Sequence, residues 1–339
     1  MATKQIATNQ PKGNSEMSTT ILYHKSCNDG LIAALNFYAY FKEKDELENI
    51  IFQPVQYGEG LPDEAILKGR HVYVVDFSYH RQDMARLVEL AGHVTLLDHH
   101  ESAIHNLFTG EKWLTGEQHR SSDEKEGLYL LSSAKAGIWI NKSRSGATLA
   151  YNEVGQFTKN DRIKTTLKYL SKRAEDRDNW IFAYEDSKAV HEYVRSLGFN
   201  LDKVYEAVLG EGKTIEDLFL KVKEAQIRVD MRDELARNYA RMAKPIEFMG
   251  HTVPAVNVSS DFASMVGDIL NKDAPFALMY VVTDQKILIS LRSDKDKGVD
   301  VQEIAAQLLG GGHRNASGCS IPLTELASLL KGKIQPGWL

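Results

Sequence analysis

The sequence predicts an α/β protein of two lobes, the first of which is built on a doubly wound parallel sheet. Short apolar runs, partly β-branched, alternate with segments of helical period, as they do where strands are buried between two layers of helices. Three of these runs end abruptly in ionisable residues. The chain has 339 residues, more than one hydrophobic core usually supports, so a second lobe is expected.

Strands of the first lobe are expected at residues 19–26, 72–75 and 94–97, with amphipathic helices at 29–43 and 81–92. In such sheets, ligands bind in the crevice beyond the carboxyl ends of the strands. The polar side chains that follow the strands are therefore site candidates, namely His24 with Asp29, then Asp76, then Asp98 with His99 and His100.

The pattern lapses between about residues 109 and 136, a polar and aperiodic stretch that we interpret as an insertion over the surface. A further strand is expected at Ile138–Ile140, and Ser145 is expected to cap the helix that follows. Later helices are expected at 165–186, 187–198 and 215–242. The last of these is long and heavily charged, which is typical of a helix that bridges two lobes.

A second lobe is expected to begin at Pro245, which ends the long helix. The pattern there predicts two strands joined by a short turn at Asp284 and Gln285, and helices at 261–272 and 299–309. The domain boundaries that we infer are a disordered extension at 1–19, a first lobe at 20–190, a helical linker at 191–245 and a C-terminal lobe at 246–339.

Composition narrows the class of protein. A net charge of −5 with 43% hydrophobic residues does not suggest a protein coated for nonspecific nucleic-acid binding. We find no run of apolar residues long enough for a membrane span and no N-terminal signal core. Cys27 and Cys319 lie far apart, without CxxC spacing. We therefore expect a reduced, cytoplasmic protein with no membrane partner.

Three consecutive glycines, Gly310 to Gly312, precede His313 and Arg314. Glycines relieve side-chain crowding, so that backbone amides can approach an anionic group, and the two following side chains add donors and charge. The segment therefore fits a phosphate-binding loop. A flexible turn between a helix and an edge strand is the alternative interpretation of the glycines.

Together, these segments resemble the DHH phosphoesterase superfamily with its DHH-associated C-terminal domain. The resemblance covers most of the chain, from about residue 20 to about 325, and its strength lies in the order and spacing of the motifs. The segments that carry it are YHKSCNDGLIAAL, VYVVDFS, LLDHHES, AEDRDNW, ISLRS and GGGHRNASG.

This resemblance implies a phosphoesterase with two divalent cations, usually manganese, in a cleft between two lobes. Two divalent ions roughly 3.5 to 4 Å apart make a water nucleophilic and neutralise charge on the attacking and leaving oxygens. Carboxylate and imidazole ligands suit Mn²⁺ or Mg²⁺ better than Zn²⁺, although zinc stays open.

The resemblance implies that Asp98, His99 and His100 are catalytic residues and that the metal ligands are His24, Cys27, Asp29, Asp76, His99 and Asp178. Asp76 is the expected bridging carboxylate and His99 a metal ligand, while Asp98 orients the histidines from behind. His100 is then free to contact the phosphate. Asp178, two residues before a tryptophan, is the expected ligand of the fourth motif, with Asp176 as the alternative.

The expected substrate residues lie at the far end of the chain. Arg292 resembles the substrate arginine of the family, although an isolated arginine at a strand end is more often a surface ion-pair partner. The glycine segment supplies the other residues of this expected site, which are Gly311, Gly312, His313 and Arg314.

The first motif departs from the family pattern His-x-Asp-x-Asp-Gly. When Asp29 is aligned with the last aspartate of that pattern, Cys27 stands where the first aspartate belongs, and His24 lies one residue further away. Two interpretations of Cys27 stay open, a thiolate ligand and a small buried residue. The identity of the metal is the inference most affected by this change.

Three functions remain to be compared. The first is a metal-dependent phosphodiesterase for short single-stranded oligonucleotides or for linear or cyclic dinucleotides. The second, on the same site, is an exopolyphosphatase, pyrophosphatase or nucleotide phosphatase. The third is a degenerate nucleotide sensor. Few lysines lie near the glycine segment, which favours nucleotides slightly over polyphosphate. We also regard a homodimer as compatible with the sequence.

Overall fold

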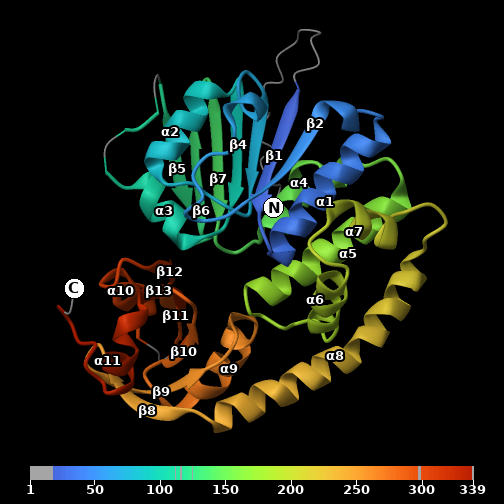
Figure 1. The fold of residues 1–339 in the computed structure, drawn as a ribbon. Coiled ribbons are helices and arrows are strands. Elements are labelled where there is room, and N and C mark those ends of the chain that lie inside the picture. The colour runs from blue at the N-terminus through green and yellow to red at the C-terminus, as the bar shows by residue number, and fades with distance from the viewer. Residues whose placement is uncertain (1–17, 111, 115–116, 124, 297–298, 338–339) are drawn as a thin grey trace.

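The computed structural model describes residues 18–110, 112–114, 117–123, 125–296 and 299–337. Most of the extension predicted at 1–19 lies outside the described residues. The described chain forms two lobes, each with its own sheet, joined by the long helix α8 (Ile215–Arg241) (Figure 1). This arrangement confirms the predicted α/β architecture.

The first sheet has the strand order β2-β1-β3-β4-β7-β6-β5. Its strands are β1 (Thr19–His24), β2 (Ile50–Val55), β3 (His71–Val75), β4 (His93–Asp98), β5 (His119–Asp123), β6 (Leu128–Ser132) and β7 (Ala136–Asn141). The first five strands in this order pair in parallel, whereas β6 and β5 pair antiparallel. The sheet is therefore mixed, and parallel only in the part that carries the site.

Two features of this sheet differ from the sequence-based prediction. The stretch at 109–136 does not simply run over the surface, because β5 and β6 within it form a hairpin that extends the sheet beyond β7. Strand β2 was not predicted at all. It pairs with β1 at the edge of the sheet and contains Pro54, which lacks an N–H to donate and is tolerated on edge strands.

Helices cover both faces of the first sheet. They are α1 (Asn28–Glu43), α2 (Arg81–Leu90), α3 (Glu101–Phe108), α4 (Gly146–Glu153), α5 (Asp161–Asp178), α6 (Ser187–Ser196) and α7 (Leu201–Val208). Alternate residues of the buried strands enter opposite cores: Ile21 packs with α1, α4 and α5, and its neighbour Leu22 packs with α2. Side chains of α6 and α7 belong to the first of these cores, so the connection between the lobes narrows to α8.

The second sheet has the order β12-β13-β11-β10-β9-β8. Its strands are β8 (Lys244–Phe248), β9 (His251–Asn257), β10 (Ala277–Val282), β11 (Lys286–Arg292), β12 (Gly311–His313) and β13 (Ala316–Pro322), and its helices are α9 (Ala263–Leu270), α10 (Val301–Ala306) and α11 (Leu326–Leu330). Pro245 lies inside β8 and does not terminate α8, which ends at Arg241.

Short 3₁₀ helices complete the described chain, at Leu47–Asn49, Glu64–Ile66, Gly155–Phe157, Ser260–Phe262, Asn271–Asp273 and Leu323–Glu325. Helix α8 packs against α6 of the first lobe and α9 of the second, while β12 approaches α3 (Figure 1). The glycine-rich strand of the second lobe therefore faces the carboxyl ends of the first sheet. No helix in the described part of the chain combines the length and hydropathy needed to span a bilayer.

Candidate metal and substrate site

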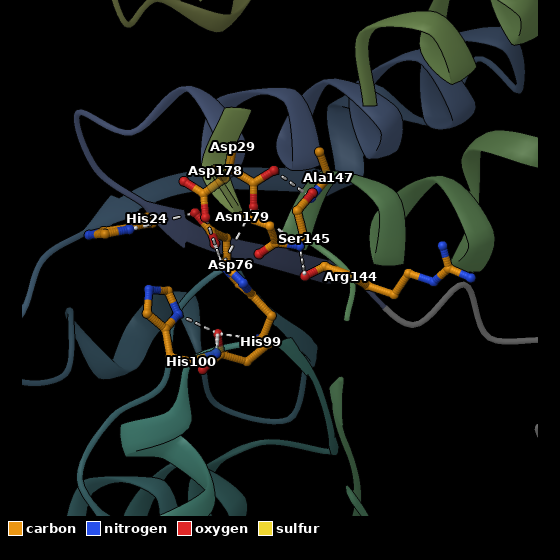
Figure 2. A network of polar contacts seen from close by, with 12 residues as sticks. His24, Asp29, Asp76, His99, His100, Arg144, Ser145, Ala147, Asp178 and Asn179 are labelled. Atoms are coloured by element: carbon orange, nitrogen blue, oxygen red, sulfur yellow. Dashed lines mark hydrogen bonds and ion pairs between the residues drawn. The ribbon is translucent and has the colours of Figure 1, made fainter. Parts of the chain in front are cut away.

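Four elements of the first lobe bring acidic and imidazole side chains to one place (Figure 2). Asp29 lies in the first turn of α1, Asp76 follows β3, His99 follows β4 and Asp178 ends α5. His99 Nε2 lies 3.1 Å from Asp76 Oδ1, 3.3 Å from Asp178 Oδ2 and 3.9 Å from Asp29 Oδ2. The structure thus gathers three carboxylates that were predicted as ligands around the imidazole of a fourth, His99.

Burial and mutual repulsion shape the electrostatics of this cluster. Burial alone would raise the pKa of Asp76, but the neighbouring imidazoles of His24 and His99 hold that pKa well below its usual value. Burial, followed by the charges of Asp76 and Asp178, raises the pKa of Asp29 well above its usual value. Carboxylates crowded in this way are costly without a cation among them.

The backbone around Asp76 is tightly constrained. Its φ of +55° is in the left-handed region, which is strained for a residue other than glycine and is found mainly where function requires it. A Cβ at Gly146 would collide with Asp76 Cβ. Asp29 in turn accepts hydrogen bonds from the backbone N–H groups of Gly146, at 2.6 Å, and Ala147, at 3.1 Å. The N-terminus of α4 therefore fixes both aspartates.

His24 and Cys27 form a second group of potential metal ligands with Asp76. His24 Nδ1 is 3.6 Å from Asp76 Oδ2, and each of these buried atoms has no hydrogen-bond partner among the described residues. Cys27 Sγ lies within 4.8 Å of their ligand atoms. Burial, and then Asp76, raises the pKa of the Cys27 thiol well above its usual value. Both interpretations of Cys27 stay open in this geometry.

These residues fit divalent cations. Potential ligand atoms lie within 4.8 Å of one another in three groups, which are His24, Cys27 and Asp76; Asp76, His99 and His100; and Asp29, His99 and Asp178. Buried polar atoms without a hydrogen bond, such as Asp76 Oδ2, are rare in folded proteins. A cation between Asp76 and His24 would satisfy both.

Asp98 holds the two histidines in place and belongs to none of the three groups. Its Oδ1 accepts hydrogen bonds from the backbone N–H of His99 and from Nδ1 of His100, both at 2.7 Å. The second of these bonds fixes the His100 ring so that its Nε2 is left for another partner. Asp98 therefore holds the His99 backbone and the His100 ring, and the orienting role expected from the sequence stays a prediction.

The two aspartates proposed for the fourth motif have different surroundings. Asp178 is 37% exposed and its carboxylate faces His99. Asp176 is buried and accepts hydrogen bonds from Ala183 N, at 2.7 Å, Tyr184 N, at 3.1 Å, and Ser187 Oγ, at 2.5 Å. Asp176 thus fixes the loop after α5, and the geometry favours Asp178 as the ligand.

The residues of the second lobe that were predicted to bind the substrate have different partners. The ring of His313 stacks on that of His100, with centroids 5.0 Å apart and planes at 20°. Arg292 is held by Ser264, whose Oγ accepts from Nη2 at 3.1 Å. Arg314 instead lies 3.6 Å from Asp300 and borders a separate cavity with Glu101 of α3.

The three glycines have distinct roles. Gly310 and Gly312 are needed for close packing, because a Cβ at either position would collide with the backbone of β13. Gly312 also has a φ of +143°. Gly311 has open space where a Cβ would lie. Residues 311–313 thus form the short strand β12, which pairs with β13. Of the three glycines, Gly311 is the one with open space where a side chain would lie.

Sequence reasoning missed two residues of the site. Gly146 follows the capping residue Ser145, and its position after a parallel strand was the signal that a helix N-terminus would meet the aspartates. Arg177 stands between the two aspartates of the fourth motif and was not singled out. Its guanidinium lies 4.2 Å from the centroid of the Trp180 ring.

Comparison with known proteins identifies related chains. The DHHA1 domain model matches residues 253–334. The uncharacterized protein R106 of Acanthamoeba polyphaga mimivirus is 25% identical over 320 residues, covering 90% of this chain and 68% of that protein. Oligoribonuclease NrnB of Bacillus subtilis is 26% identical over 260 residues. The match covers 74% of this chain and 59% of the length of NrnB.

Solved structures share the fold at low identity. The DHH domain of a protein from a family of ribosomal proteins has a TM-score of 0.57 at 12% identity, with 93% of this chain and 85% of that chain covered. RecJ of Thermus thermophilus, solved in complex with Mn²⁺, has a TM-score of 0.52 at 13% identity, with 92% of this chain and 50% of that chain covered. Both confirm the two-lobed fold.

Proposed function

We propose that this protein is a phosphodiesterase with two divalent cations, because its DHHA1 domain and its relatives are similar to the DHH family, whose members hydrolyse phosphoester bonds. Its proposed substrates are short single-stranded oligonucleotides, or linear or cyclic dinucleotides. The observation that carries the proposal is the convergence of Asp29, Asp76 and Asp178 on His99 at the carboxyl edge of a parallel sheet. The similarity to oligoribonuclease NrnB supports the choice of substrate.

The proposed ligands of the cations are His24, Cys27, Asp29, Asp76, His99 and Asp178. Divalent ions held there supply an activated water and neutralise charge on the phosphate oxygens. We favour Mn²⁺, with Mg²⁺ or Zn²⁺ as alternatives, because carboxylate and imidazole ligands predominate. Binding of Mn²⁺ by the structurally similar RecJ supports a divalent cation.

The remaining residues bind and orient the substrate in this proposal. His100, fixed by Asp98 through Nδ1, directs its Nε2 toward a phosphate oxygen. His313 approaches from the second lobe and stacks against His100, so that it closes the site on the side of the DHHA1 domain. Arg292 supplies a fixed positive charge.

The proposal is tested with a panel of substrates, assayed with Mn²⁺, Mg²⁺ and Zn²⁺. The panel holds dinucleotides, longer single strands, cyclic dinucleotides and polyphosphate. Asp76→Asn is expected to reduce hydrolysis by about 1000-fold or more, on the order of the loss of a bridging ligand, without preventing folding. The matched control is Asp161→Asn, since the Asp161 side chain is 95% exposed.

Three other outcomes of these assays would each contradict one part of the proposal. Unchanged turnover of Asp76→Asn at saturating Mn²⁺ would show that Asp76 is no bridging ligand. Hydrolysis of polyphosphate alone would assign the protein to the exopolyphosphatases. Binding of nucleotides without turnover under any metal would assign it to the sensors.

A further inference from the structure

The loop after strand β2 brings an aromatic side chain to the cluster of candidate metal ligands. Strand β2 pairs in parallel with β1, with Val55 beside His24, so both strands end at the same edge of the sheet. Tyr57 lies two residues beyond the end of β2. Its ring centroid is 5.4 Å from that of His24 and 6.2 Å from that of His100. Tyr57 therefore borders the cluster from the edge of the first sheet.

The Tyr57 ring is supported by the protein and is still partly open. It packs on Phe77, which is buried, with centroids 4.5 Å apart and planes at 38°. The rings of His24 and His100 meet it nearly edge-on, with planes at 77° and 76°. Tyr57 is nevertheless 45% exposed. Exposure of one aromatic side chain is ordinary on a protein surface, so its position beside the cluster, and not its exposure, points to a ligand.

Polar contacts fix the loop that carries Tyr57. Gln56 Oε1 accepts a hydrogen bond from the backbone N–H of Tyr57 at 3.0 Å and lies 3.2 Å from His24 Nε2. The backbone N–H of Glu59 donates to Gln56 O at 3.1 Å, and its carboxylate forms an exposed ion pair with Lys25. A ring that is fixed before the substrate arrives loses little conformational freedom on binding. Tyr57 is thus preorganised to receive a flat group.

The phenol of Tyr57 is uncharged at neutral pH. Although part of the residue is exposed, burial, and then the carboxylates of Asp98 and Asp76, raise the pKa of Tyr57 above its usual value. A neutral ring does not repel an anionic substrate. Its aromatic face stabilises a nucleobase by stacking, whatever the base, because every base has a π-face. A chain of phosphate groups offers no such flat surface, so the ring favours nucleotides over polyphosphate.

We propose that Tyr57 stacks on a nucleobase of the substrate and so makes the site selective for nucleotides. This inference rests on the proposed function and decides between its two candidate substrate classes, which are nucleotides and inorganic polyphosphate or pyrophosphate. The stacked base belongs to a nucleotide whose phosphate lies at the metal centre, because His100, the proposed phosphate contact, is itself a neighbour of the ring.

The competing explanation is that Tyr57 only covers Phe77. Two conservative variants separate stacking from packing. Tyr57→Phe keeps the ring and removes the hydroxyl, whereas Tyr57→Leu keeps apolar bulk and removes the aromatic face. Stacking predicts that the contribution of the base survives in Tyr57→Phe and disappears in Tyr57→Leu. Packing predicts that truncation lowers thermal stability without any dependence on the base.

The test compares a dinucleotide with two analogues, each of which lacks one of its bases. In the wild-type protein, removal of one of the two bases is expected to lower kcat/KM about 10-fold or more, as for the loss of one base stacked on an aromatic ring. Tyr57→Leu should abolish this preference and Tyr57→Phe should keep it. If Tyr57→Leu keeps the preference, or if the wild-type protein has none, the inference is overturned.

Phe157→Leu is the matched control for the loss of an exposed ring. Phe157 is 58% exposed and follows the C-terminal end of α4, whereas the N-terminus of that helix contacts Asp29. Its substitution should leave the preference for the base unchanged. A preference that is lost equally in Phe157→Leu would count against a specific role of Tyr57.

A binding measurement separates this inference from the proposed function. Titration calorimetry in the presence of Mn²⁺ compares adenosine 5′-monophosphate with ribose 5-phosphate, neither of which contains a phosphodiester bond. About 10-fold tighter binding of the nucleotide, lost in Tyr57→Leu and kept in Tyr57→Phe, would support stacking even if no dinucleotide is hydrolysed. Equal binding of the two ligands by the wild-type protein, or binding of neither, would overturn the inference even if dinucleotides are hydrolysed.

Discussion

At the scale of single residues, Cys27 is the proposed ligand at which this chain departs from the motif pattern of the DHH family. A thiolate binds soft metals such as Zn²⁺ and Cd²⁺ more strongly than Mn²⁺. Burial raises the pKa of Cys27, so the thiol stays protonated unless a metal displaces the proton. Whether Sγ coordinates a cation therefore depends on which metal is supplied.

We predict that Cys27→Ser abolishes the ultraviolet thiolate–Cd²⁺ absorption band and weakens Zn²⁺ binding about 10-fold or more, while the Mn²⁺ requirement changes less. The expected difference follows from the loss of a soft ligand. The control is Cys319→Ser, because Cys319 lies in the second lobe and burial raises its pKa to about 12. A band that persists in Cys27→Ser would leave Cys27 as a packing residue.

Most candidate ligands could be predicted from the sequence, because a polar residue at the end of an apolar strand is a recognisable pattern. His24, Asp76 and His99 each follow or end an apolar run, and parallel strands bring such positions to one edge. Gly146 also follows a parallel strand, β7, but it has no polar side chain to mark it as a site residue. Its role depends on how closely α4 packs against Asp76, which no sequence pattern shows.

At the scale of elements, the turn after α5 decides where Asp178 lies. The sequence predicts one helix over 165–186, whereas α5 ends at Asp178. The apolar period continues through Trp180 and Phe182, so periodicity alone could not locate the end. The helix ends because the Asp176 carboxylate accepts hydrogen bonds from Ala183, Tyr184 and Ser187, which folds the chain back on itself.

We predict that Asp176→Ala destabilises the protein by about 2–4 kcal/mol, because several donors of the turn lose a charged acceptor. The affinity for divalent cations should fall as well, since Asp178 adjoins the released turn. Thermal unfolding and hydrogen exchange of residues 179–187 measure these effects. Ser187→Ala, which removes one of the donors, should show a smaller loss. Normal exchange protection of the turn in Asp176→Ala would contradict this account.

Two strands of the first sheet show where sequence patterns fail at this scale. Strand β5 has the sequence HRSSD and is exposed throughout, so no hydrophobic alternation marks it, and it joins the sheet by pairing with β6. Strand β2 is an edge strand with mostly half-buried side chains and an internal proline. The strands predicted correctly are those buried between helices, whose apolar runs are imposed by the two cores.

At the scale of the whole molecule, few contacts set the relation between the lobes. Helix α8 connects them, Arg195 of α6 pairs with Asp261 at 2.7 Å, and Lys295 donates to Asn179 O. His313 adds a contact at the site itself, through its ring on His100. These contacts place the glycine strand β12 over the proposed metal ligands, and among the described residues the second lobe supplies none of the three groups of potential ligand atoms.

This arrangement predicts that His313→Ala raises KM for a dinucleotide about 10-fold and changes kcat by less than about threefold, because a contact made equally in the ground and transition states affects binding alone. Tenfold in KM corresponds to about 1.4 kcal/mol of binding energy. His119→Ala, at an exposed position of β5, serves as the control and should change neither constant. Steady-state kinetics at saturating Mn²⁺ distinguish the outcomes. If kcat falls as far as kcat/KM, His313 contacts the transition state specifically, and the second lobe then takes part in the chemical step.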